Sequence, residues 1–158
     1  MICNKNVRSR PGISRRRLLQ GVGALILAAR MPAARAEPPP IPALESFLAG
    51  RSPRWERLHL ELPALADNGQ AVPMRLSLPG PFASGSALQS IHLFSEKNPV
   101  PEMAVFEFPS PPTKVEVESR VRLAGAQYVV AVAVMSDGVL YADAVEVLVT
   151  IAGCLDAS

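Results

Sequence analysis

The side chain with the most reactive chemistry in this sequence is the thiol of Cys154, four residues before the final Ser158. A cysteine can form a disulfide or hold a sulfur-containing group covalently, and the reacting species is the thiolate. Asp156 adds a negative charge that disfavours the thiolate, and no lysine, arginine or histidine lies close in sequence. We therefore expect Cys154 to serve as an attachment point whose activating charges come from a partner, and not as the nucleophile of a self-contained enzyme.

Residues 1–36 have the order of regions found in a bacterial export signal. The stretch "SRRRLLQ" (Ser14 to Gln20) combines consecutive arginines with two leucines, an apolar run reaches Ala29, and Ala34-Arg35-Ala36 forms an A-x-A cleavage pattern. The paired arginines favour the twin-arginine route. The apolar run is about 12 residues long, whereas a membrane-spanning helix needs roughly 20. We expect a twin-arginine signal peptide, a periplasmic protein and no membrane anchor.

Removal of this leader changes the charge and the cysteine count of the protein. Residues 1–36 carry one lysine, seven arginines and no acidic residue, so the formal net charge falls from +2 to −6 without them. An acidic protein is a poor match for the phosphate backbone, which argues against nucleic-acid binding. Cys3 leaves with the leader, and a single remaining cysteine in an oxidising compartment suggests intermolecular pairing or a reactive thiol.

The remaining chain predicts one small all-β domain. Residues 37–54 are a proline-rich linker with a short helix expected over Ala43–Ala49. About eight short strands follow within residues 55–151, separated by proline, glycine and turn signals such as "DNG" at Asp67–Gly69. We predict an immunoglobulin-like antiparallel β-sandwich, with a small barrel as the alternative.

The individual strands differ in how their apolar residues are arranged. Residues 114–123 alternate between apolar and charged side chains, which predicts one packed face and one exposed face. "YVVAVAVM" (Tyr128 to Met135) is apolar on both faces and predicts a central strand. "VLYADA" follows the turn at Ser136–Gly138, and the final strand is expected at Val145–Ile151.

The last strand positions the thiol. Gly153 ends the apolar alternation, and residues 152–158 are expected to form a flexible C-terminal arm, since chain ends outside a sheet are usually poorly ordered. Four extended residues beyond Thr150 span about 13–14 Å. Cys154 is thus expected to reach into the cleft of a partner while the sandwich remains outside.

Other candidate functional residues give weaker signals. His59 and His92 lie far apart within alternating strands, so exposed strand histidines are expected rather than metal ligands. No motif for a metal or a cofactor is visible. Glu96 and Lys97, in the stretch "SEKNP", read as a solvated turn, with contact to a partner as the alternative.

Residues 58–151 resemble SoxY, the sulfur-carrier subunit of bacterial thiosulfate oxidation. The matching segments are "LELPALADNGQAVPMRLSL", "SIHLFSEKNPVPEMAVFEF" and "VESRVRLAGAQYVVAVAVMSDGVLYADAVEVLVTI", followed by Gly153-Cys154. The resemblance implies an immunoglobulin-like sandwich, a heterodimer with a SoxZ-like subunit, and a cysteine on a C-terminal arm that carries sulfur species covalently. It implies three partner enzymes as well: a c-type cytochrome that attaches thiosulfate, a hydrolase that releases sulfate, and a sulfane dehydrogenase. Cys154 is the one position that takes the carrier role.

The arm departs from the glycine-rich pattern of the family. Here the residues after Gly153-Cys154 are Leu155 and Asp156, which add bulk and charge beside the thiol. This ending is closer to that of SoxY-related paralogs with an "AACIE"-type arm. Three interpretations stay open on sequence grounds: a covalent carrier, either for standard thiosulfate oxidation or as a paralog serving other partners; a thiol enzyme with a base supplied by the fold; and a structural sandwich with an incidental cysteine.

Overall fold

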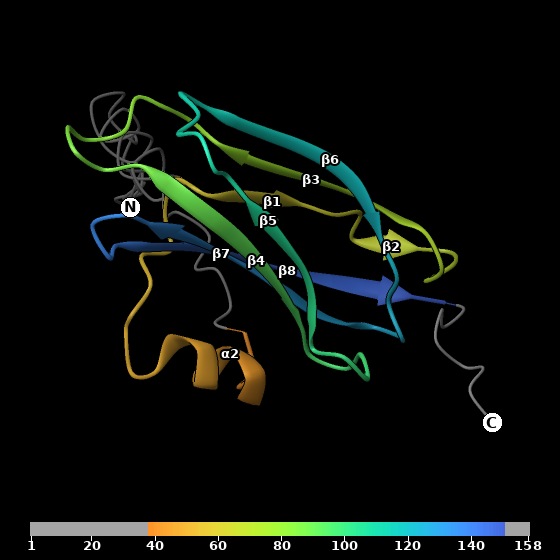
Figure 1. Ribbon diagram of the computed structural model, residues 1–158. Coiled ribbons are helices and arrows are strands. Elements are labelled where there is room, and N and C mark those ends of the chain that lie inside the picture. The colour runs from red at the N-terminus through yellow and green to blue at the C-terminus, as the bar shows by residue number, and fades with distance from the viewer. Residues whose placement is uncertain (1–37, 151–158) are drawn as a thin grey trace, which may run out of the picture. The chain divides into compact units, whose positions relative to one another are not determined.

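Two facing β-sheets and one short helix make up the part of the chain that the computed structural model describes, residues 38–150 (Figure 1). One sheet has three strands in the order β1-β3-β6, and the other has five in the order β2-β8-β7-β4-β5. This architecture confirms the predicted all-β sandwich. The elements are α2 (Pro42–Leu48), β1 (His59–Glu61), β2 (Leu65–Ala66), β3 (Val72–Leu78), β4 (Leu88–Ser95), β5 (Glu102–Glu107), β6 (Val115–Val121), β7 (Gln127–Met135) and β8 (Leu140–Val149).

The main core lies between the two sheets and follows from the period-two pattern of the strands. Met74, Leu76 and Leu78 of β3 point inward and are almost fully buried, whereas Arg75 between them is exposed. Val115 and Val121 at the two ends of β6 face the same core. Alternating side chains therefore separate a dry interior from a charged outer face, as the sequence predicts for residues 114–123.

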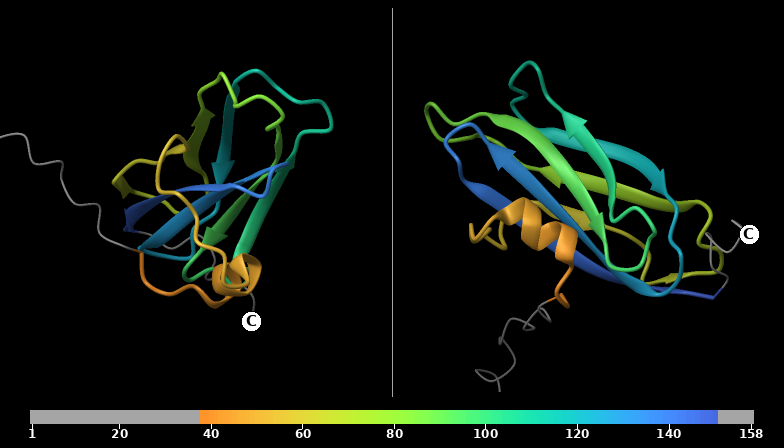
Figure 2. Two further views of the ribbon diagram at one scale, coloured as in Figure 1. Left: turned by 90° about the vertical axis from the view of Figure 1, so that its left-hand side faces the viewer. Right: turned by 60° about the horizontal axis from the view of Figure 1, so that its bottom comes forward.

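A second core lies on the outer face of the five-stranded sheet, beneath α2 (Figure 2). Val130 and Val132 of β7 point to this face, and Ile41 and Leu44 pack against it from the helical segment. The neighbouring Val129, Ala131 and Ala133 point to the main core instead. This double coverage explains why β7 is apolar on both sides. The helix runs over Pro42–Leu48, and Ala49 ends it with a left-handed φ of 47°.

Strand β8 corrects one prediction. The sequence was divided into "VLYADA" and a separate strand from Val145, but the structure has one strand of ten residues, Leu140–Val149. Its first four residues are buried on both faces, since Leu140 and Ala142 lie beneath α2 while Tyr141 faces the main core. The second half of the strand is covered on one face only. The change in pattern reflects where α2 ends and not a break in the strand.

β8 also pairs with β2, at the edge of the five-stranded sheet. β2 runs parallel to β8, with Leu65 opposite Leu148 and Ala66 opposite Val149. All other strand pairs are antiparallel.

Among the helices of residues 38–150, none is long and apolar enough to span a bilayer.

The two sides of the sandwich are closed differently. On the β1–β8 side, the backbone N–H of Leu60 donates to Oδ2 of the buried Asp143 at 2.9 Å. Arg54 adds backbone hydrogen bonds to Leu140 and Ala142 on the same side. On the opposite side β5 and β6 are the end strands of their sheets. Asp143 thus joins the sheets at one side, and the β5–β6 side remains open.

Candidate functional site

Thr150, the last residue that the structure describes, is held against the β2 segment by two hydrogen bonds. Its backbone N–H donates to the carbonyl of Ala66 at 3.1 Å, and its hydroxyl donates to the carbonyl of Asp67 at 2.7 Å. These bonds continue the parallel β2–β8 pairing by one residue. The predicted attachment residue Cys154 and the predicted hinge Gly153 lie outside the described residues. The structure shows how Thr150, four residues before Cys154, is anchored.

Three loops surround this end of the sandwich, which we call the arm end: residues 67–71, 96–101 and 122–126. Asn98 links two of them. Its Oδ1 accepts hydrogen bonds from the backbone of Ala124 and from Nε2 of Gln127, both at 2.9 Å, and its Nδ2 donates to the carbonyl of Arg122 at 2.8 Å. Gln127 is only 2% exposed. The third loop joins through the N–H of Leu123, which donates to the carbonyl of Gly69 at 2.7 Å.

The residues next to Asn98 strengthen this link. The backbone N–H of Lys97 donates to Oε1 of Gln127 at 2.8 Å, and its Nζ donates to the carbonyl of Ala126 at 2.6 Å. Oε2 of Glu96 accepts the backbone N–H of Tyr128 at 3.0 Å. The turn that the sequence assigned to solvent is therefore bonded to the neighbouring loop along its length. Sequence reasoning missed Asn98, whose only local signal is its place before Pro99 in a turn.

Two carboxylates, those of Glu146 and Glu96, affect the phenol of Tyr128, which follows Gln127 on β7. Its hydroxyl donates to Oε2 of Glu146 at 3.2 Å. Its surroundings raise the pKa of Tyr128 above the ordinary value, first through desolvation, then through Glu146 and then through Glu96. The phenol therefore stays neutral and acts as a hydrogen-bond donor at physiological pH.

A groove runs along the open side of the sandwich at the arm end. It has a volume of about 370 Å³, and its walls come from the loop before β5, from β5 itself and from the end of β6. The loop and β5 supply the apolar Val100, Met103 and Phe106, whereas β6 and the residue after it supply Arg120 and Arg122. We call this feature the edge groove.

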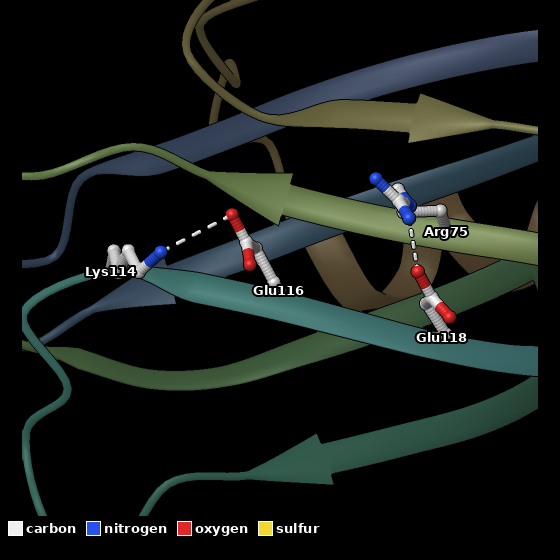
Figure 3. Close-up of polar contacts among 4 residues, drawn as sticks. All are labelled: Arg75, Lys114, Glu116 and Glu118. Carbon is white, nitrogen blue, oxygen red and sulfur yellow. Dashed lines mark hydrogen bonds and ion pairs between the residues drawn. The ribbon is translucent and has the colours of Figure 1, made fainter.

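The outer face of the three-stranded sheet carries charges of both signs, and four of them form two ion pairs. Figure 3 shows the ion pair of Arg75 on β3 with Glu118 on β6, and the pair of Lys114 with Glu116 at 3.4 Å. All four side chains are more than half exposed, so each pair adds little to stability. A hollow of about 650 Å³ on this face is lined by two arginines and two glutamates. This face has the character of a hydrated strand surface, as the sequence suggested.

The two histidines lie on different sheets. His59 on β1 is exposed, as expected. His92 on β4 is not, because its side chain is only 16% exposed and stacks on Phe47 of α2 with a centroid distance of 4.4 Å. Its Nδ1 is 2.7 Å from Oε1 of Glu102, and its Nε2 is 3.0 Å from the hydroxyl of Ser90. Within residues 38–150, no three histidine, cysteine or acidic side chains converge in a way that would hold a metal.

A family model for the sulfur oxidation protein SoxY matches residues 45–154, which include most of α2, every strand and Cys154 as the last matched residue. The chain belongs to the SoxY family. SoxY proteins are the carrier subunits of bacterial sulfur-oxidation systems, so membership indicates a role in sulfur oxidation and partners from such a system. A search of curated proteins found no match.

Among solved structures, similar folds include superoxide reductases. A superoxide reductase (neelaredoxin) from Ignicoccus hospitalis is 16% identical, with a TM-score of 0.46 and coverage of 60% of this chain and 80% of that one. A variant of the same protein is also 16% identical, with a TM-score of 0.47 and coverage of 73% and 90%. These similarities are too low to bear on function.

Proposed function

We propose that this protein is a periplasmic carrier that holds sulfur intermediates covalently on Cys154 and presents them to partner enzymes of sulfur oxidation. The observation that carries the proposal is the SoxY family match, which extends through the sandwich and ends at Cys154. The anchoring of Thr150 to β2 supports it, because it holds the root of the arm while leaving Cys154 a span of about 13–14 Å. A SoxZ-like subunit would be the second half of the carrier.

Loading would join the Cys154 thiol to thiosulfate. A sulfur–sulfur bond forms, the thiol releases its proton, and two electrons pass to a partner of the c-type cytochrome class. A hydrolase partner would then add water across the bond to the terminal sulfonate. Sulfate leaves, and a proton from the water goes to the persulfide that remains on Cys154. A sulfane dehydrogenase would oxidise the outer sulfur of that persulfide to a sulfonate, with three water molecules supplying the oxygen atoms and six electrons passing to an acceptor of the cytochrome class. A second hydrolysis would then release sulfate and restore the thiol.

The composition of the arm favours a variation on this function. Leu155 and Asp156 stand where the family pattern has small glycines. A side chain and a negative charge next to the thiol narrow the choice of enzyme clefts that can admit the arm. A SoxY paralog that carries another cargo for different enzymes is therefore the second candidate. A structural sandwich with an incidental thiol is the alternative that the experiment must exclude.

Intact-protein mass spectrometry tests the carrier proposal. The protein is purified without reductant from the periplasm of cells grown on reduced sulfur, beside a Cys154→Ser variant. We expect mass increments that correspond to added sulfur or sulfonate, that disappear with reductant and that are absent from the variant. An unmodified thiol, or only a disulfide-linked homodimer through Cys154, would reject the carrier function in favour of the incidental thiol.

A further inference from the structure

The edge groove leaves apolar side chains exposed at the arm end, as far as the described residues 38–150 cover it. Val100 is 68% exposed, and Met103 and Phe106 remain partly exposed although they point toward the main core. The inward residues of the central strands β4 and β7, by contrast, are almost fully buried. Burial of apolar area lowers the free energy by about 25 cal/mol per Å², so a segment that covers these side chains is stabilised there. Among the strands of residues 38–150, none lies beside the outer backbone edge of β5, and such an edge can accept an added extended segment.

Two arginines lie at the β6 wall of the groove. The guanidinium groups of Arg120 and Arg122 make no hydrogen bond or ion pair within the part of the chain that the structure describes, and both residues are exposed. The other cation of this sheet near the arm end, Arg75, is already paired with Glu118. The groove therefore combines an apolar floor with a positive wall, although the chain without its leader has a net charge of −6.

The segment that follows Thr150 has the complementary chemistry. Leu155 is apolar and Asp156, directly after it, is acidic. β8 and β5 are three strand positions apart in the five-stranded sheet, which corresponds to about 14 Å. Five extended residues from Thr150 to Leu155 span about 17 Å, enough to reach the near end of the groove at Val100 and Arg122. The arm end carries both the point of departure and this near end.

We propose that residues 151–158 dock in the edge groove of the same chain, with Leu155 against Val100 and Met103 and with Asp156 facing Arg120 and Arg122. Docking brings Cys154 to the mouth of the groove and withdraws it from solvent. The docked position is a resting position for the arm, from which a partner with a better cleft releases it. That use depends on the proposed carrier function, whereas the docking itself does not depend on any cargo.

A competition between two engineered cysteines tests this proposal. The full chain carries Cys3→Ser, so that Cys154 is its one native thiol, together with either Val100→Cys or Leu65→Cys. Both positions are exposed apolar residues at the arm end, at 68% and 57% exposure, so neither substitution disturbs the core. Leu65 is the closer to the root of the arm, because its strand partner Leu148 is two residues before Thr150. If the arm has no docking site, Cys154 should therefore form a disulfide with position 65 at least as fast as with position 100.

Disulfide formation with Cys154 is followed under diamide, which takes up the two electrons and two protons released by each pair of thiols. We expect the intramolecular disulfide to form at least about fivefold faster with Val100→Cys than with Leu65→Cys. We also expect this rate to fall at least about threefold with Arg120→Gln and Arg122→Gln together, with Asp156→Asn, or in high salt. Lys114→Gln, which removes a cation at the other end of β6, should leave it unchanged.

Equal or faster disulfide formation at position 65 would overturn the proposal. So would a rate at position 100 that does not change when both arginines or Asp156 are substituted. A disulfide between two chains through Val100→Cys would assign the groove to a second copy instead. Because the assay contains no sulfur cargo, it separates this proposal from the carrier function. The arm can dock in a protein that shows no sulfur adduct by mass spectrometry, and a loaded carrier can lack the docked state.

Discussion

At the residue scale, Asn98 does the most to hold the arm end together. Its side chain accepts two hydrogen bonds, from Ala124 and Gln127, and donates two, to the carbonyl of Arg122 and to the sulfur of Met103. The amide of Gln127 is buried, so the loss of its partner leaves a desolvated donor without a hydrogen bond. The position of the loops beside the edge groove depends on this one residue.

We expect Asn98→Ala to lower the free energy of unfolding by about 2 kcal/mol, because it leaves buried polar groups of Gln127 and the loop unpaired. Urea denaturation measures the change. Asn68→Ala is the matched control, since Asn68 lies in an exposed turn and accepts one hydrogen bond, from the N–H of Gln70. The control should cost under about 1 kcal/mol. Equal losses in the two variants would mean that the Asn98 contacts add no more than an ordinary turn.

At the scale of elements, α2 is an integral part of the fold. The sequence predicted that residues 37–54 form a linker with a short helix. The sequence of such a short helix does not indicate whether the helix packs against the sheet. Leu44 is 7% exposed and packs with Ile41 against β4, β7 and β8. Phe47 covers His92 of β4. Removing the helix would expose a second apolar face of the five-stranded sheet.

Leu44→Ala should therefore lower the free energy of unfolding by about 2 kcal/mol, near the lower limit for truncation of a buried leucine because a short surface helix can partly close the gap. Ser46→Ala, on the exposed side of the same helix, should change it by less than about 0.5 kcal/mol. Thermal and urea unfolding of the two variants provide the comparison. A loss below that of Ser46→Ala would show that α2 does not contribute to the stability of the sandwich.

At the scale of the whole molecule, charge divides the chain into two parts. All of the excess positive charge lies in residues 1–36, and the rest is acidic. This division agrees with an exported protein whose leader is removed, which is the localisation we propose. The chain belongs to a family of sulfur oxidation proteins, and the partner enzymes that we propose for it would have to be in the same compartment.

The export route makes a prediction of its own. Replacing Arg15 and Arg16 with lysine keeps the charge but removes the paired guanidinium groups, so we expect the precursor to stay in the cytoplasm. Replacing Arg8 and Arg10 with lysine keeps both arginines of the motif and should leave export unchanged. Cell fractionation and the mass of the processed protein give the result. Normal processing of the Arg15 and Arg16 variant would point to the general secretory route.

The sequence by itself determined the features that depend on local pattern. Period-two alternation over residues 114–123 predicted the buried and exposed faces of β6, and the apolar run at Tyr128 predicted the doubly covered strand β7. The family resemblance rested on collinear segments and is confirmed by the family match. Cys154 stood out because it would be the single thiol of a chain that the sequence predicts to be exported. These inferences needed no knowledge of which strands are neighbours.

Only the tertiary structure decided what depends on contacts between distant residues. Ten residues from Leu140 form one strand because residues 140–147 pair with β7 without interruption, and α2, about a hundred residues earlier, covers the first part of it. Asn98 acquires its role from a loop some 25 residues later, and the edge groove exists because β5 and β6 end different sheets on the same side. A local pattern records whether a side chain is buried, but the partner that buries it is set by the packing of the whole chain.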